Sequence, residues 1–91
     1  MKVNLNKPMR SLDGSDHQSE TLGKVLATYI VSQSKGDALK MYSWAMKLYE
    51  GKELELDKAD FIVLRRFVED NEQLYIISKA QILEVLGEFK E

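Results

Sequence analysis

Residues 36–51 of this 91-residue chain read GDALKMYSWAMKLYEG, and this stretch carries both the start and the end of a helix. Gly36 suits the left-handed position that stops a preceding helix, and Asp37 suits the N-cap of the next helix. Glu50 and Gly51 form a similar stop signal at the other end. Apolar side chains cover most of the circumference in between, and the narrow polar stripe contains only Lys40, Ser43, Lys47 and Glu50. We therefore expect this helix to lie at the centre of the fold or to be shared with a partner.

A helix with a single apolar stripe precedes this one. Its buried face is indicated by apolar residues at i, i+3, i+4, i+7 and i+8, which are Leu22, Val25, Leu26, Tyr29 and Ile30. Thr21 and Ser19 are both suitable N-caps for it. The connection around Lys35 and Gly36 is short, so the second helix must fold sharply back against the first.

A third helix begins with a complete N-terminal signature. Asp57 can accept a hydrogen bond from the amide three residues later, and Asp60 is placed as an acidic variant of the capping-box partner. Leu56 and Phe61 are spaced to form a hydrophobic staple across this start. Four apolar residues on one stripe then predict the buried face of the helix: Phe61, Leu64, Phe67 and Val68.

The last helix is unusually apolar. Ten of the sixteen residues at 74–89 are apolar, and at helical spacing they cover roughly 240° of the circumference. A monomer of this size has few other elements with which to cover two such wide arcs. We therefore expect the edges of the two arcs to form a partner interface, contributed by Trp44, Leu48, Ile82 and Phe89.

The N-terminal twenty residues carry weaker signals. Val3 and Leu5 alternate with polar residues, and Asp13-Gly14 follows, which together are typical of a β-hairpin because glycine tolerates the positive φ of a tight primed turn. The alternative is a mobile tail with a local turn at Asp13-Gly14. A short apolar segment at 54–56 could pair with residues 3–5 in a small sheet.

The expected fold is mainly α. It is a four-helix small domain at 21–91, with helices at about 21–35, 37–50, 57–70 and 73–89. An N-terminal β-hairpin or extended segment at 1–20 precedes this helical domain.

Composition argues against several classes of function. The chain has 13 basic and 15 acidic residues and a net charge of −2, so it has no general attraction for nucleic acid or anionic lipid. It contains no cysteine, which excludes disulfides and cysteine zinc sites and fits a reducing compartment. No secretory leader and no apolar run of about 18 residues is visible, so we expect no membrane association and a cytoplasmic location.

Catalytic and metal-binding constellations are also missing from the sequence. The single histidine, His17, lies in the least patterned region. A calcium loop starting at Asp13 would need glycine at its sixth position, where Gln18 stands. The spacing of Asp57 and Asp60 is what helix capping requires. We expect no enzymatic activity, no cofactor and no metal.

Several segments together resemble a group of small uncharacterised proteins encoded in tailed-phage and prophage genomes. They are VNLNKP at 3–8, DG at 13–14, LG at 22–23, KGDALK at 35–40, LDKAD at 56–60 and AQIL at 80–83. The resemblance covers nearly the whole chain, and it implies a viral assembly or accessory role without carrying over any catalytic or binding residue.

We therefore expect a non-enzymatic phage or prophage interaction protein that self-associates or binds another protein, in particle assembly or an accessory process. Its expected location is the host cytoplasm or the virion. The runner-up is a phage-encoded modulator that binds a host protein. A third reading is a nucleic-acid-associated factor, which the charge makes the least favourable of the three.

Overall fold

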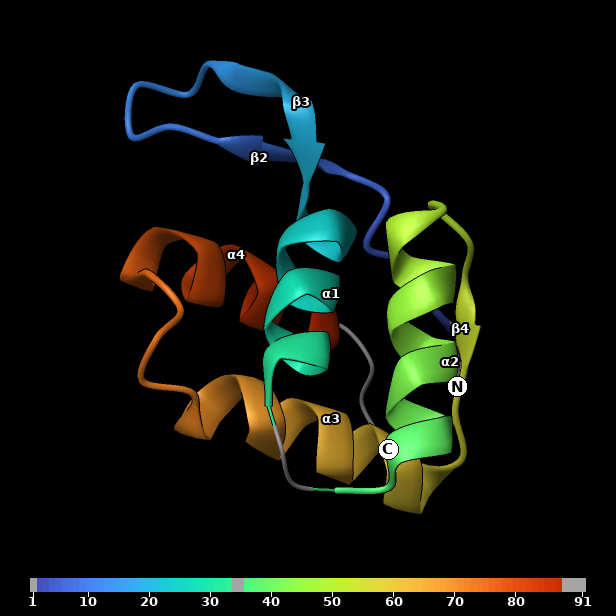
Figure 1. Ribbon diagram of the computed structural model, residues 1–91. Helices are drawn as coiled ribbons and strands as arrows, with labels where there is room; N and C mark the ends of the chain where they lie inside the picture. The colour runs from blue at the N-terminus through green and yellow to red at the C-terminus, as the bar shows by residue number, and fades with distance from the viewer. Residues whose placement is uncertain (1, 34–35, 88–91) are drawn as a thin grey trace.

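The computed structural model describes residues 2–33 and 36–87, and within them it confirms the mainly helical fold (Figure 1). The helices are α1 (Leu22–Ser32), α2 (Ala38–Tyr49), α3 (Lys58–Asp70) and α4 (Ile76–Gly87). The strands are short: β1 (Lys2–Val3), β2 (Pro8–Arg10), β3 (Asp16–Thr21) and β4 (Leu54–Glu55). Strand β1 pairs antiparallel with β4, and β2 pairs antiparallel with β3.

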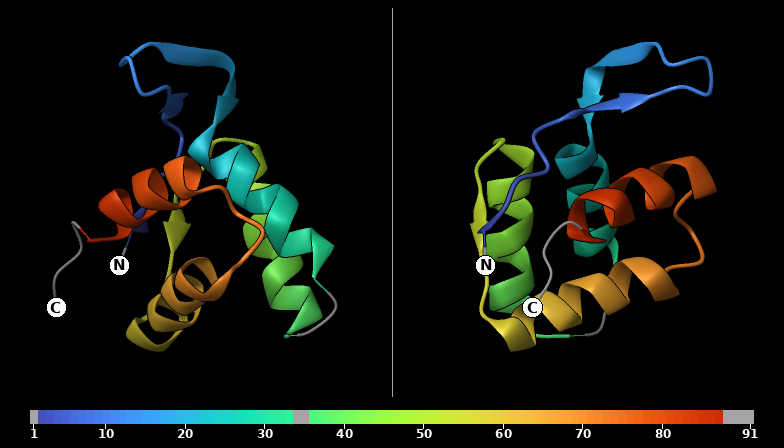
Figure 2. Two further views of the ribbon diagram at one scale, coloured as in Figure 1. Left: turned by 90° about the vertical axis from the view of Figure 1, so that its left-hand side faces the viewer. Right: turned by 180° about the vertical axis from the view of Figure 1, so that it is seen from behind.

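Helices α1 and α2 form one layer of the molecule. They lie side by side and run in opposite directions, and α3 crosses beneath them (Figure 1). In the left view of Figure 2, α1 and α2 lie on the right, while α3 and α4 lie towards the other side. Each helix of this layer therefore has one side turned towards the rest of the fold and one side turned away from it.

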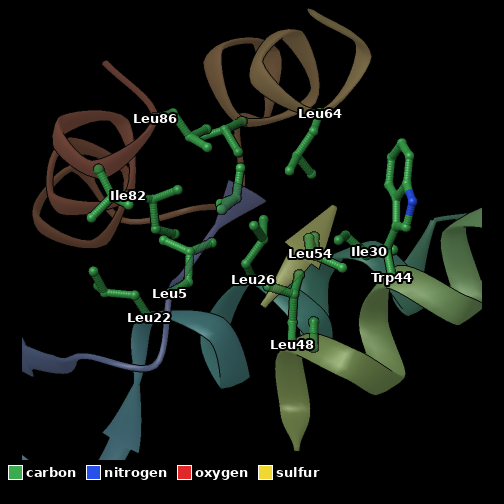
Figure 3. Close-up of a cluster of buried hydrophobic side chains, with 14 of the residues drawn as sticks. Leu5, Leu22, Leu26, Ile30, Trp44, Leu48, Leu54, Leu64, Ile82 and Leu86 are labelled. Atoms are coloured by element: carbon green, nitrogen blue, oxygen red, sulfur yellow. The ribbon is translucent and has the colours of Figure 1, made fainter. Parts of the chain in front are cut away.

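The core lies between this layer and the remaining elements. Side chains from all four helices and from both strands of the β1–β4 sheet converge there (Figure 3). Val3 and Leu5 are fully buried among them. Val3 lies opposite Leu54 in the sheet, which confirms the predicted pairing of the two short segments. Val3 and Leu5 thus pack in the same core as the helices.

The predicted helix caps are present. Thr21, rather than Ser19, caps α1, and its Oγ1 accepts from the Lys24 amide at 3.1 Å. Asp37 and Asp57 cap α2 and α3, with their Oδ1 atoms 3.2 Å and 2.7 Å from the amide nitrogens three residues later. The Asp60 carboxylate accepts from Lys40 Nζ at 2.9 Å, so it links α3 to α2. Local polar chemistry therefore fixes where three helices begin.

Helix α2 ends as its sequence predicts. Gly51 has a φ of +80°, and the Lys52 amide donates to Lys47 O at 2.9 Å while the Gly51 amide donates to Leu48 O at 3.2 Å. These two hydrogen bonds form a Schellman motif, which satisfies carbonyls that the helix leaves without partners. The end of α2 is thus set by a glycine that adopts the left-handed conformation without steric cost.

The predicted hairpin is formed by β2 and β3, and its turn differs from the primed turn expected. The Gly14 amide donates to Ser11 O at 2.9 Å, and the Ser11 amide donates to Ser15 O at 2.8 Å. Gly14 has a φ of +88°, whereas Asp13 keeps a negative φ and its Oδ1 accepts from the Ser15 amide at 3.0 Å. This is the pattern of a three-residue loop closed by a left-handed glycine.

Helix α4 begins later than expected. Asn71 follows α3, and its Oδ1 accepts from the amides of Gln73 and Leu74 at 2.8 Å and 3.0 Å. This side chain holds the connection in a turn and places Leu74 in the core before the helix starts at Ile76. The Asn71 side chain thus satisfies two backbone amides of the connection, and the helix itself begins at Ile76. Helix α1 ends at Ser32, earlier than the expected end at 35, and Gln33 is extended. Residue 35 itself and the expected end of the last helix, at 89, lie outside the described residues.

The cap of α3 leads to a first prediction. Replacing Asp57 with alanine leaves the Asp60 amide without its acceptor and should lower the free energy of unfolding by about 1 kcal/mol. Urea denaturation measures this change, and Asp57→Asn, which keeps an acceptor oxygen, should retain most of the stability. Equal midpoints for Asp57→Ala and the parent chain would remove Asp57 from this role.

A second prediction concerns Gly23, where three segments meet. A Cβ atom at Gly23 would lie 2.7 Å from Leu48 O and 3.3 Å from Leu5 O. Gly23→Ala must therefore push these backbones apart, and we expect a loss of about 1–3 kcal/mol in unfolding free energy. Gly87→Ala is the matched control, because a Cβ there meets no heavy atom within 4 Å. Thermal denaturation should show a lower midpoint for the first variant and an equal or higher one for the second.

Candidate functional site

An apolar groove with a volume of about 400 Å³ lies between α1 and α2. Three large side chains of α2 line it while remaining solvent-exposed: Tyr42 is 59% exposed, Met46 48% and Tyr49 60%. Residues from α1 complete the lining, namely Ala27, Thr28, Val31 and Ser32. We call this groove and its walls the α1–α2 face.

The sequence of α2 builds this face because it carries two apolar stripes. The first stripe, made by Trp44, Ala45 and Leu48, is buried in the core. The second consists of residues separated by three, four and three positions, all of them exposed: Leu39, Tyr42, Met46 and Tyr49. Spacing of this kind keeps side chains in line along one side of a helix, as in a seam between packed helices. Helix α2 thus offers apolar surface on two sides, and the fold covers only one.

The two walls of the groove differ in side-chain size. The α2 wall carries the large side chains Tyr42, Met46 and Tyr49, whereas the α1 wall is made of Ala27, Thr28, Val31 and Ser32. We call the exposed stripe of α2 the ridge, and the part of the groove over the small side chains of α1 the trough. A projecting surface therefore lies beside a hollow one on the same molecule.

The two ends of the α1–α2 face differ in charge. At one end, Lys24 Nζ lies 5.4 Å from the centroid of the Tyr49 ring, which is within the range of a cation–π interaction. Glu50 follows directly in sequence and also lines the groove. At the other end, Val31 and Leu39 line an adjoining apolar hollow of about 380 Å³. The face therefore has Lys24 and Glu50 at one end and the apolar side chains of Val31 and Leu39 at the other.

The structure corrects the interface predicted from the sequence. Trp44, Leu48 and Ile82 are only 6%, 1% and 0% exposed, so they belong to the core and are not accessible to a partner. Helix α2 is rotated so that its Trp44 and Leu48 face inwards and the ridge faces outwards. Phe89 lies outside the described residues. The spacing of Leu39, Tyr42, Met46 and Tyr49 was available in the sequence, but periodicity alone does not say which of two apolar stripes faces the core.

A second exposed apolar patch lies where the hairpin meets α4, beside a hollow of about 660 Å³. Leu12 at the hairpin tip is 98% exposed, and Ile76 at the start of α4 is 85% exposed. The side chain of Gln81 fixes the hairpin to α4, because its Oε1 accepts from the Arg10 amide at 2.9 Å and its Nε2 donates to Arg10 O at 2.7 Å. The hairpin is thus held in place by backbone hydrogen bonds to one side chain.

Titratable side chains do not gather into a site in the described part of the chain. His17 lies in β3, and its side chain is not among those described. The side chains that the structure describes, which leave out those of residues 16–19, contain no group of three or more histidine, aspartate and glutamate residues arranged for a metal ion. The hydrogen bond to Asp60 and the charge of that carboxylate raise the pKa of Lys40 above its ordinary value of 10.5. This contact joins α2 to α3.

Comparisons with known proteins give no match: no family model fits the chain, and no curated protein or solved structure shows significant similarity to it. Within the ranges described, the helices are too short or too polar to span a membrane. The α1–α2 face is therefore the feature of the molecule from which a function can be inferred.

The burial of Trp44 gives a third prediction. Because this single tryptophan belongs to the monomer core, its fluorescence emission should stay blue-shifted and unchanged when the protein is diluted from high to low micromolar concentration. The double variant Trp44→Phe/Tyr42→Trp moves the reporter to the ridge and should shift to longer wavelength on dilution. A shift of the native emission would place Trp44 in an interface after all.

Proposed function

We propose that this protein is a non-enzymatic interaction protein that self-associates through the α1–α2 face. The observation that carries this proposal is the exposed ridge, in which four large apolar side chains lie in line on a helix whose other apolar stripe is already buried. Exposed apolar residues are common singly, but a continuous apolar groove with an aligned wall marks an interaction site. Tyrosine and methionine are also enriched in the centres of protein interfaces.

The energetics favour a contact that uses the whole ridge. Full burial of one large apolar side chain contributes about 1.5–3 kcal/mol, and the ridge residues are already partly buried, so each has less to contribute. Association costs about 4–15 kcal/mol in lost freedom of motion. A single ridge residue therefore cannot hold a complex together. Burial of the ridges of two copies at once can offset this cost, which is why a second copy is a favourable occupant.

The resemblance to phage and prophage proteins supports a biological setting for this proposal. A symmetric dimer needs no second gene product, which suits a small component of particle assembly or of an accessory phage process. The proposed location is then the host cytoplasm or the virion. The alternative is a modulator that places the same face against a host protein, and the adaptable side chain of Met46 is compatible with such a partner.

A fourth prediction tests self-association. Sedimentation equilibrium at micromolar concentration should give a dimer mass for the native chain. Met46→Glu puts a charge into the centre of the ridge and should give a monomer mass with an unchanged helical circular-dichroism spectrum. Lys47→Gln is the matched control, because it changes the net charge by the same amount at an exposed position that does not line the groove. It should remain a dimer.

A strictly monomeric native chain would reject self-association. A native dimer that Met46→Glu leaves intact would place the contact elsewhere on the surface.

A further inference from the structure

We propose that two copies associate about a two-fold axis parallel to α1 and α2, so that the ridge of each copy packs into the trough of the other. This inference rests on the proposed self-association and adds the symmetry of the contact. Helices α1 and α2 of the two copies then form a four-helix bundle in which α2 of one copy lies against α1 of its partner.

Side-chain size decides which helices meet. If the two α2 helices met directly, the large side chains Tyr42, Met46 and Tyr49 would face their own copies and leave both troughs empty. If α2 of one copy lies against α1 of the other, these side chains face Ala27 and Thr28 of the partner. Alternation of large and small side chains allows the close packing found in protein interiors. The ridge and the trough lie beside each other on one face, so a two-fold rotation can fill both at the same time.

The direction of the axis follows from the two different ends of the face. An axis parallel to the helices keeps the ends together, so Lys24 of one copy approaches Glu50 of the other, and Val31 approaches Leu39 of the other. An axis that lies in the plane of the face and perpendicular to the helices would instead place α2 against α2 of the other copy, with Leu39 opposite Tyr49, and would separate Lys24 from Glu50. Only the parallel axis joins the large side chains of α2 to the small ones of α1 and brings Lys24 to Glu50 of the other copy.

The helix dipoles agree with this choice. Helices α1 and α2 run in opposite directions within one copy (Figure 1). With the axis parallel to them, α2 of the partner also runs opposite to α1, so every pair of neighbouring helices in the bundle is antiparallel. Antiparallel neighbours place the positive end of one helix beside the negative end of the next. A perpendicular axis would also give antiparallel facing helices, but it would pair α1 with α1 and α2 with α2, so the large side chains of α2 would meet one another.

Disulfide trapping tests the symmetry, and the cysteine-free chain is suited to it. Variants that each carry one cysteine are mixed in pairs under mild oxidation, and the cross-linked products are measured by mass spectrometry. The parallel axis predicts a heterodisulfide between Val31→Cys and Leu39→Cys chains. The perpendicular axis predicts one between Leu39→Cys and Tyr49→Cys chains instead, because only thiols on residues that face each other can bond.

The control is Leu12→Cys, which is exposed at the hairpin tip and far from the face in sequence and structure. The Val31→Cys and Leu39→Cys pair should cross-link at least about tenfold faster than a Leu12→Cys and Leu39→Cys pair, because docked thiols meet at a millimolar effective concentration. Preferential bonding of Leu39→Cys to Tyr49→Cys would overturn the parallel axis and leave self-association intact. Cross-linking no faster than the control, together with a monomer mass for the native chain, would overturn both.

Discussion

The close approach of three backbones at Gly23 is the constraint on which the rest of the fold depends. The Gly23 amide donates to Leu5 O at 2.9 Å, and a Cβ atom at this position would lie 2.7 Å from Leu48 O. The N-terminal segment can therefore lie against the start of α1, and the end of α2 can pack beside it. From this position Val3 and Leu5 reach the core, and β1 reaches β4. A larger residue at position 23 would separate all three segments.

This arrangement also determines which surface is left over. The N-terminal segment, α3 and α4 together supply enough apolar surface to cover the inner side of the α1–α2 layer, and Trp44 and Leu48 are buried there. No described element covers the outer side of α2. The ridge is therefore a consequence of a fold that has buried one of two apolar stripes and has no further element for the other.

An apolar stripe that the fold merely left uncovered would need no particular shape or charge, but the α1–α2 face has both. Large side chains stand on one wall and small ones on the other, and a lysine and a glutamate are placed at the same end. A face with a ridge beside a trough can fit a second copy of itself after a two-fold rotation. A flat apolar surface would instead fit many partners poorly. The proposed association with an identical chain rests on these features of shape and charge.

The sequence by itself determined the helices, most of their ends and the presence of the hairpin. The reason is that these features depend on contacts over three or four residues, as when Asp57 accepts from the Asp60 amide or Gly51 takes a positive φ. Asn71 shows the limit of such signals, because its side chain holds residues 71–74 in a turn where the apolar residues that follow had predicted helix from residue 73.

Only the tertiary structure decided which apolar side chains are buried. Leu5 enters the core because it meets Gly23, and Leu48 is buried while Tyr49 is not because of how α2 rests on α1. Such contacts join residues far apart in the chain. Helical periodicity contains no information about which of two apolar stripes will make these contacts and be buried. For this reason the candidate interface lies on Tyr42, Met46 and Tyr49 rather than on the residues that the sequence pattern indicated.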